Sequence, residues 1–172
     1  MAIFFMTYGY PVSIAVSSDT IDGYVVEIAP GKDVLLTSEY SVVWANLLNS
    51  GFSDDLSTVE NLAGLGLLIA GNSKKDLIEQ CSNLYPIRQG IGSSYVKEIN
   101  GIKKQYYSVQ IGEKNYSLSE FQRLLWYYSN ASMKLRDIIM LLETSYNIQI
   151  SNDDICEQFF LMLRFALVFL RK

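Results

Sequence analysis

The dipeptide Asn100-Gly101 places the tightest limit on what this chain can fold into. It separates two runs rich in residues that favour β-strands, YVKEI before it and IKKQYYSVQI after it. A two-residue turn between antiparallel strands needs positive φ angles at both positions, and Asn followed by Gly meets that need best. Residues 112–115, GEKN, give a second turn signal. We therefore predict a small β-meander over residues 95–116.

Three helices and a strand are expected after the meander. Ser119-Glu120-Phe121-Gln122 has the pattern of a capping box for the first helix, Ser132 is expected to cap the second, and Ser151-Asn152-Asp153-Asp154 should open the third. Residues 166–170, ALVFL, predict the closing strand. Apolar residues at helical spacing indicate one buried face in each helix. These residues are Phe121, Leu124, Leu125 and Tyr128 in the first helix, Leu135, Ile138, Ile139 and Leu142 in the second, and Ile155, Phe159, Met162 and Leu163 in the third.

The N-terminal part also begins with predicted strands and continues with a helix. YPVSIAVSS and YVVEIA are typical of strands, and Pro30-Gly31 predicts the turn before the returning strand DVLLTS. A helix should begin near Ser38 and end at Asn49-Ser50-Gly51. Its inward residues are Tyr40, Val43, Trp44, Leu47 and Leu48.

The following segment contains two more expected helices and the expected domain boundary. A helix from about Asp54 should give way to a short strand at residues 66–69. Ser73 is expected to cap a compact helix that stops before Pro86. Residues 88–94, RQGIGSS, are interpreted as a loop and as the boundary between two domains, residues 1–87 and 88–172.

The two parts of the sequence have features of an internal repeat. Ser38-Glu39-Tyr40 aligns with Ser119-Glu120-Phe121, since both follow a strand and open an aromatic-rich helix. Residues 62–68 align with residues 162–168, but these two segments lie further apart in the sequence than the first matching pair does. The second half should therefore contain one helix, around residues 132–146, that the first half lacks. Ordinary apolar patterns also align by chance over a few residues. The agreement of strand order, cap and closing strand favours a true repeat.

Composition limits the class of protein and its partners. The 172 residues suffice for a real core, and 49% hydrophobic against 19% charged residues indicates a globular chain. The net charge of −4 is unfavourable for a general nucleic-acid binder, whose affinity comes largely from phosphate neutralisation. Neither the apolar start nor the hydrophobic C-terminal stretch, interrupted by Arg164, has the pattern of a signal peptide or a membrane span. We expect a cytoplasmic protein without a membrane partner.

Residues 106–171 resemble a PqqD-like domain, the winged-helix family of RiPP recognition elements. The matching segments are Leu118-Ser119, Leu135–Ile139, Tyr146, Asp153-Asp154 and Leu167-Val168. The resemblance implies a non-catalytic module that receives a leader peptide as an extra strand on its hairpin edge, beside the third helix. It offers no catalytic residues to carry over. The N-terminal half would be a degenerate second copy, so the expected fold is α+β, with two tandem winged-helix-like units and the second more complete.

No residue pattern points to catalysis, a cofactor or a metal. The chain contains no histidine, which excludes Ser-His and Cys-His catalytic pairs. Cys81 and Cys156 are the two cysteines, and zinc is not expected with so few ligands. We interpret them as reduced, buried thiols, with a disulfide between them as the alternative. Asp54-Asp55 and Asp153-Asp154 lie at helix starts, where carboxylates stabilise the helix dipole. We expect no enzyme activity.

The favoured hypothesis is protein or peptide binding, and the alternative is a winged-helix DNA-binding regulator. A groove-reading helix needs outward basic or amide side chains, whereas the expected third helix presents acidic ones. A hairpin edge beside an acidic helix suits the addition of a peptide strand. Exposed edge strands also need charged residues merely to prevent aggregation, which is the plainer explanation of the hairpin lysines. The predicted contact residues are Tyr95, Lys97, Lys103, Lys104, Tyr106, Tyr107, Tyr116, Asp153, Asp154 and Glu157.

Overall fold

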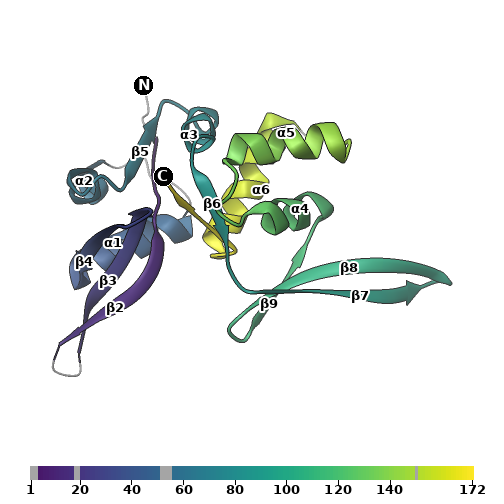
Figure 1. Ribbon diagram of the computed structural model, residues 1–172, viewed down its shortest axis with the longest axis horizontal. Coiled ribbons are helices and arrows are strands. Elements are labelled where there is room, and N and C mark those ends of the chain that lie inside the picture. Colours follow the sequence, from purple (N-terminus) through teal and green to yellow (C-terminus); the bar gives the residue numbers. More distant parts are fainter. Residues whose placement is uncertain (1–3, 18–19, 51–55, 150) are drawn as a thin grey trace.

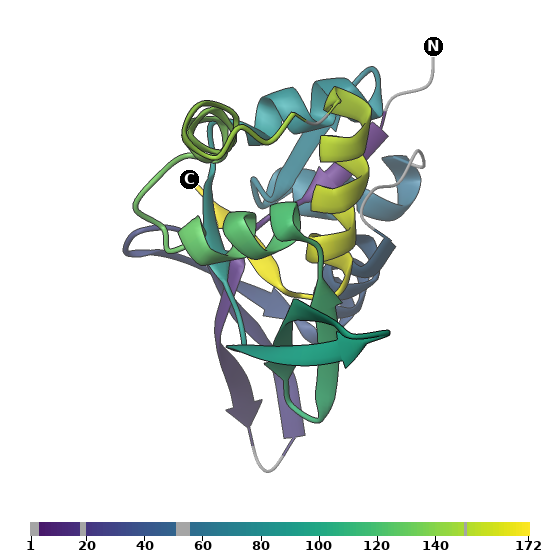
Figure 2. The same ribbon diagram turned by 90° about the vertical axis from the view of Figure 1, so that its right-hand side faces the viewer.

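The computed structural model, which describes residues 4–17, 20–50, 56–149 and 151–172, combines small antiparallel sheets with helices (Figures 1 and 2). The chain is therefore a mixed α+β protein, as expected. The strands are β1 (Phe4–Thr7), β2 (Tyr10–Ser17), β3 (Thr20–Ala29), β4 (Lys32–Thr37), β5 (Leu68–Gly71), β6 (Tyr85–Arg88), β7 (Ile91–Ile99), β8 (Ile102–Ile111), β9 (Lys114–Leu118) and β10 (Val168–Arg171). The helices are α1 (Ser38–Ser50), α2 (Leu56–Gly64), α3 (Lys74–Cys81), α4 (Glu120–Tyr128), α5 (Leu135–Ser145) and α6 (Asn152–Arg164).

Two three-stranded meanders, β2-β3-β4 and β7-β8-β9, have the turns that the sequence predicted. Ile99 lies opposite Ile102, and Asn100 and Gly101 between them have φ angles of 53° and 77°. These positive angles at both turn residues are those of the type I′ turn. The Pro30-Gly31 turn is likewise confirmed, with Ala29 opposite Lys32.

Two strand pairs, β1–β5 and β6–β10, are built alike. In each pair a strand that precedes a meander lies antiparallel to a strand that follows a helix. The Tyr8 amide donates to the Leu67 carbonyl at 3.3 Å, and the Gln89 amide donates to the Leu167 carbonyl at 2.9 Å. The residues just before these carbonyls, Gly66 and Ala166, both have positive φ. The short closing strands predicted from the sequence are thus present, as β5 and β10.

Tryptophan side chains hold the first helix after each meander in a similar way. The Trp44 indole in α1 donates to the Tyr8 carbonyl at 3.2 Å. The Trp126 indole in α4 donates to the Gln89 carbonyl at 2.8 Å. Each bond ties a helix to the segment between the preceding short strand and its meander, which fixes the helix against the base of the sheet.

Strand β10 lies in the middle of the core. Val168 and Leu170 are at most 1% exposed. On the side away from β6, the Gly9 amide donates to the Leu170 carbonyl, and the Lys172 amide donates to the Ile28 carbonyl, both at 2.7 Å. The last strand therefore connects both parts of the chain through main-chain bonds.

Most of the residues predicted to face inward are buried. Trp44, Phe121 and Phe159, which we expected in the core, are at most 5% exposed. Phe165 is different, because 40% of it is exposed. It follows the last turn of α6, and its ring packs on that of Tyr116 in β9 with centroids 5.0 Å apart. Cys81 is fully buried, whereas the Cys156 side chain lies outside what the structure describes.

The expected caps of α3, α4 and α6 are present, whereas Ser132 does not cap α5. The Ser119 and Gln122 side chains form the reciprocal capping box, and Ser73 and Ser151 also accept amide bonds. The N-cap of α5 is Lys134, without a side-chain bond, and the Ser132 hydroxyl bonds to Asn130 instead.

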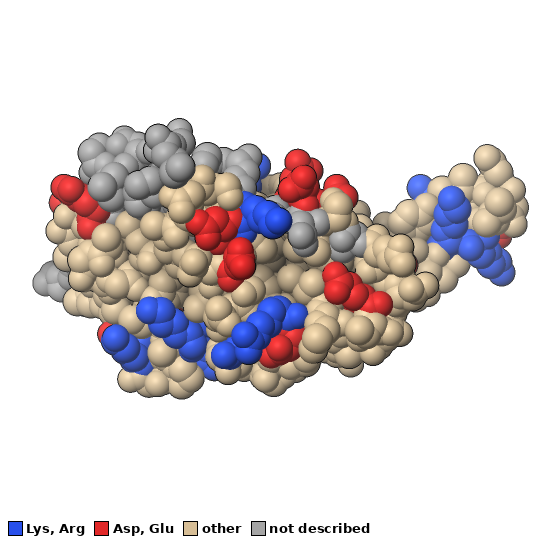
Figure 3. Space-filling view, turned by 90° about the horizontal axis from the view of Figure 1, so that it is seen from above, with Lys and Arg blue, Asp and Glu red and all other residues tan. Residues whose placement is uncertain are grey.

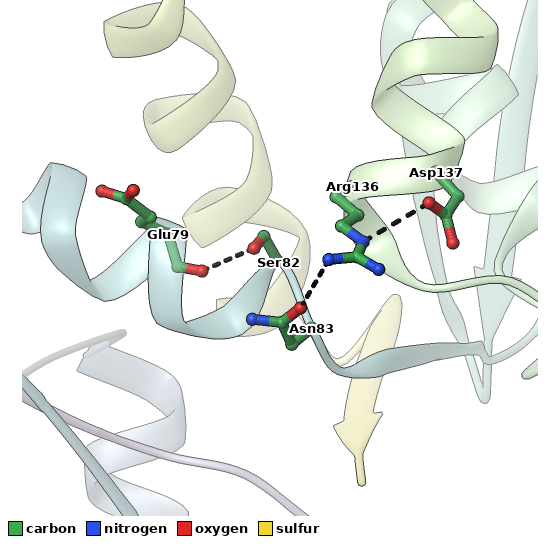
Figure 4. A network of polar contacts seen from close by, with 5 residues as sticks. All are labelled: Glu79, Ser82, Asn83, Arg136 and Asp137. Carbon is green, nitrogen blue, oxygen red and sulfur yellow. Dashed lines mark hydrogen bonds and ion pairs between the residues drawn. The ribbon is translucent and has the colours of Figure 1, made fainter.

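The first amides of α5 find their acceptors in the segment after α3. Leu135 donates to the Leu84 carbonyl at 2.9 Å, and Arg136 donates to the Ser82 carbonyl at 3.0 Å. The Arg136 side chain extends the same junction, since its Nη1 donates to Asn83 at 3.1 Å (Figure 4). Tertiary contacts thus supply the partners that a capping side chain normally gives.

The interpretation of residues 88–94 as a loop is wrong. Strand β7 begins at Ile91, and only Gln89 and Gly90 separate it from β6. The glycines serve close packing: a Cβ on Gly92 would lie 2.7 Å from the Trp126 ring. Strand β6 pairs with β10, so it is joined to the C-terminal end of the chain. A domain division between residues 87 and 88 stays a prediction.

Some other predictions concern residues that the structure does not describe. Asp54 and Asp55, expected at a helix start, lie outside them, and so does Gly51. No helix within the described ranges is long and apolar enough to span a membrane.

We predict that Gly90→Ala destabilises the protein more than Gly101→Ala does. Both glycines have positive φ, so both variants carry a similar backbone strain. Only at Gly90 would the new Cβ also meet a backbone atom, 2.4 Å from the Gln110 carbonyl oxygen. The difference in unfolding free energy should be about 1–3 kcal/mol, the usual cost of overpacking, measured by urea denaturation. Equal losses in both variants would contradict the packing described at Gly90.

Candidate functional site

The β7–β8 hairpin projects from the body of the protein (Figure 1). All nine residues of β7 are exposed, and the sheet order places β7 at an edge. Large apolar side chains lie on it in the open, with Ile91 74% and Val96 64% exposed. Tyr95, which is 49% exposed, stands opposite the partly buried Tyr106, and their rings stack with centroids 5.5 Å apart. The hairpin thus combines a free strand edge with exposed apolar and aromatic surface.

The outer end of the hairpin is basic, as the blue side chains on the projection in Figure 3 show. Lys97 lies directly opposite Lys104, and Glu98 lies opposite Lys103. All four residues are exposed. Like charges directly opposite each other destabilise a strand pair. The structure therefore gathers the three predicted lysines, and the Lys97–Lys104 pair among them is one that hairpin stability alone does not favour.

Two of the four predicted tyrosines lie elsewhere on the sheet. Tyr107 is partly buried, and the Arg123 guanidinium lies over its ring at 4.4 Å. Tyr116 in β9 is also partly buried and packs on Phe165. Tyr95 and Tyr106 are thus on the projecting part, whereas Tyr107 and Tyr116 lie on the part that packs against helices.

The predicted acidic residues are not brought together with the hairpin. Asp153, Asp154 and Glu157 are exposed at the beginning of α6. That helix has 13 residues, so about 20 Å separates its ends. The far end is the one that approaches the sheet, through Phe165 and Tyr116. Figure 2 shows the start of α6 on the opposite side of the helix layer from β7–β8.

A cleft between the sheet and α4 was missed by sequence reasoning. It has a volume of about 360 Å³, and its charged residues are Arg88 and Arg123. The sheet contributes Gly92, Ser93, Ser94, Tyr107, Ser108, Val109 and Leu118, and α4 contributes Trp126 and Tyr127. One signal pointed to it, since Arg123 and Trp126 are three residues apart and so share a face of α4. Arg88 gave no such signal, because it was assigned to a loop.

Aromatic rings hold both arginines of the cleft. The Arg88 guanidinium lies 5.0 Å from the Trp126 ring and 5.8 Å from the Tyr127 ring, and its Nη1 donates to the Tyr127 carbonyl at 2.8 Å. Arg123 lies over Tyr107, and its Nε is buried without a hydrogen-bond partner. Stacking orients the guanidinium groups and leaves their remaining N–H groups for another acceptor.

A tyrosine pair lies next to the cleft. Tyr128 packs edge-on against Tyr127, and its hydroxyl is 2.5 Å from that of Tyr146. This hydrogen bond is the main reason that the pKa of Tyr128 is raised above its usual value near 10. A tyrosine is neutral at physiological pH even at its usual pKa, so Tyr128 adds no negative charge beside the arginines of the cleft.

Neither a metal centre nor a family assignment accounts for the site. In the described ranges, no three His, Cys, Asp or Glu side chains are close enough to hold a metal ion. Comparison of the chain with protein-family models, curated proteins and solved structures found no match. Function is therefore inferred from the exposed β7 edge and the arginine cleft.

Lys104→Glu should stabilise the hairpin, and Lys103→Glu should destabilise it. The first change replaces a Lys–Lys pair with Lys97 opposite Glu, whereas the second places Glu opposite Glu98. Each shift should be roughly 0.2–1 kcal/mol, measured by urea denaturation at low ionic strength, and both should shrink in high salt. Shifts of the same sign would show that the cross-strand pairs do not determine the effect.

Proposed function

We propose that the chain is a non-catalytic peptide-binding protein that adds an extended peptide strand to the outer edge of β7. The observation that carries this proposal is a nine-residue strand at a sheet edge, exposed along its whole length. Such an edge offers main-chain donors and acceptors, while alternate side-chain positions give specificity. Natural proteins usually shorten, cover or charge an edge of this kind, and here the inner half of β7 carries no charge.

Strand geometry indicates which amides of β7 face outward. Ile99 and Ile102 flank a two-residue turn, so they form the hydrogen-bonded pair that closes the hairpin. Hydrogen-bonded and non-hydrogen-bonded pairs alternate along antiparallel strands. The outward N–H groups should therefore belong to Gly92, Ser94, Val96 and Glu98.

We also propose that the chain is a tandem of two winged-helix-like units. Support comes from the matched order of a short strand, a meander, helices and a closing strand in both parts. The equivalent main-chain bonds, from Tyr8 to Leu67 and from Gln89 to Leu167, also support it. The second unit has three helices after its meander, which is the order expected of a PqqD-like domain. In this chain β9 is the edge next to the third helix, but it has five residues against the nine of β7.

Val96→Pro should weaken peptide binding by about tenfold, because it removes one outward donor and its ring obstructs the added strand. The probes are peptides selected from a random phage-displayed library on the immobilised full chain, and their affinities are measured by fluorescence anisotropy. Val96→Thr keeps the amide and serves as the control.

Asn115→Pro makes the corresponding change on β9, where alternation from the Ile111–Lys114 pair again predicts an outward amide. It should leave binding unchanged. If only Asn115→Pro lost binding, the peptide site would be the edge of β9 and not that of β7. Failure to select any peptide, or self-association of the chain through β7 in sedimentation experiments, would overturn the proposal.

A DNA-binding regulator is the second candidate, because the projecting hairpin carries Lys97, Lys103 and Lys104 like a wing. The exposed Asp153, Asp154 and Glu157 on α6 oppose it, since they would meet phosphates with like charge. We predict that rounds of selection from a random duplex pool at moderate salt enrich no sequence. An enriched motif whose binding is lost in the Lys103→Glu, Lys104→Glu double variant would favour the regulator instead.

A further inference from the structure

The arginine cleft opens onto the same strand that we propose as the peptide edge. Gly92, Ser93 and Ser94 line the cleft and also belong to β7. Side chains of neighbouring strands at the same register lie on the same face of a sheet. A strand added to β7 therefore places alternate side chains beside the cleft.

One face of the strand pair leads to Arg123. Gly92 lies opposite Val109, and Ser94 lies opposite Tyr107. Tyr107 is covered by Arg123 of α4, and Gly92 is in contact distance of Trp126 of α4. The face that carries Gly92, Ser94 and Tyr107 is thus the face toward α4, and every second residue of an added strand would share it.

The positive charge in the cleft is not balanced by the protein's described residues. No Asp or Glu is among the residues that line it. The ion pairs of the described residues are Arg136–Asp137 and Arg171–Glu27, so none of these residues places a carboxylate within ion-pair distance of Arg88 or Arg123. Arg123 also keeps a buried Nε without an acceptor. A buried donor without a partner is unfavourable, so a bound acceptor would be stabilising.

We propose that the cleft receives an Asp or Glu side chain of the peptide that adds to β7, with Arg88 and Arg123 as its partners. The proposal rests on the strand addition described above and assigns the peptide's chemistry. Guanidinium groups offer a planar fork that matches a carboxylate. Because the cleft is continuous with the edge strand, the carboxylate is assigned to a side chain of the added strand.

The test uses two fluorescein-labelled peptides of about nine residues, long enough to cover a strand of the length of β7. They carry Val at alternate positions and either Glu or Gln at the others. Anisotropy titrations compare the full chain with Arg88→Gln, Arg123→Gln and, on β9, Lys114→Gln. The last variant removes the same charge from the same sheet outside the cleft. Circular dichroism checks that each variant is folded, and Arg88→Lys keeps the charge without the fork.

The wild-type chain should bind the Glu peptide about tenfold more tightly than the Gln peptide, since bonds to charged groups are the stronger ones. The preference should disappear in Arg88→Gln and Arg123→Gln, shrink in Arg88→Lys, and persist in Lys114→Gln. Tryptophan quenching by acrylamide gives a second readout. Trp44 is 4% exposed, so quenching reports mainly on Trp126, which the Glu peptide should protect.

Three results would overturn the assignment. Equal binding of both peptides by the wild-type chain would leave strand addition intact but exclude a carboxylate in the cleft. A preference that survives both arginine substitutions would place the recognition of charge elsewhere. Binding of neither peptide would mean that the strand addition fails, and the assignment of the cleft would fail with it.

Discussion

The burial of β10 is the constraint on which the rest of the structure depends. Its main chain pairs with β6 on one side and accepts a bond from Gly9 on the other, and the amide of Lys172 just after the strand donates to Ile28. A buried main-chain group that loses its partner costs about 1–3 kcal/mol, so the elements on both sides are held in register. Arg171 adds a partly buried ion pair with Glu27 of β3. Because this centre fixes the bases of both meanders, the β7–β8 hairpin can extend into solvent without loosening the core.

The same anchoring explains how a projecting hairpin acquires a defined site at its base. Gly90 and Gly92 let β6 and β7 pass close to Gln110 and Trp126, where a Cβ would collide. The Trp126 indole is fixed in turn by its bond to Gln89. Arg88 stacks on that ring, so the guanidinium is positioned by contacts that lead back to the core. The proposed recognition of an acidic peptide thus relies on rigid parts, whereas the outer hairpin supplies exposed main chain.

Features encoded by neighbouring residues could be predicted from the sequence, and features that need distant partners could not. Asn100-Gly101 and the Ser119 capping box specify their own geometry, so the predictions of the meander and of the start of α4 are confirmed. Ser132 failed as a cap because the carbonyls of Ser82 and Leu84 take that role from another part of the chain. The cleft was missed because β6, the sheet and α4 each contribute to it. The acidic and basic contact residues were grouped by charge and by the family resemblance, although α6 approaches the sheet with its other end.

The pairing of β6 with β10 also has a consequence for folding kinetics. Arg88 and Val168 are opposite in that pair although a whole meander and three helices separate them in the sequence. Contacts between residues so far apart in the sequence form slowly, since the intervening loop must close first. A hairpin with an adjacent turn forms in about 1–10 μs, so β7 and β8 should be paired while the core is still open. Nascent chains would then display a finished strand edge before they are compact. The facing pair of Lys97 and Lys104, unfavourable in the native hairpin, would repel a second such edge during that interval and act as a kinetic gatekeeper.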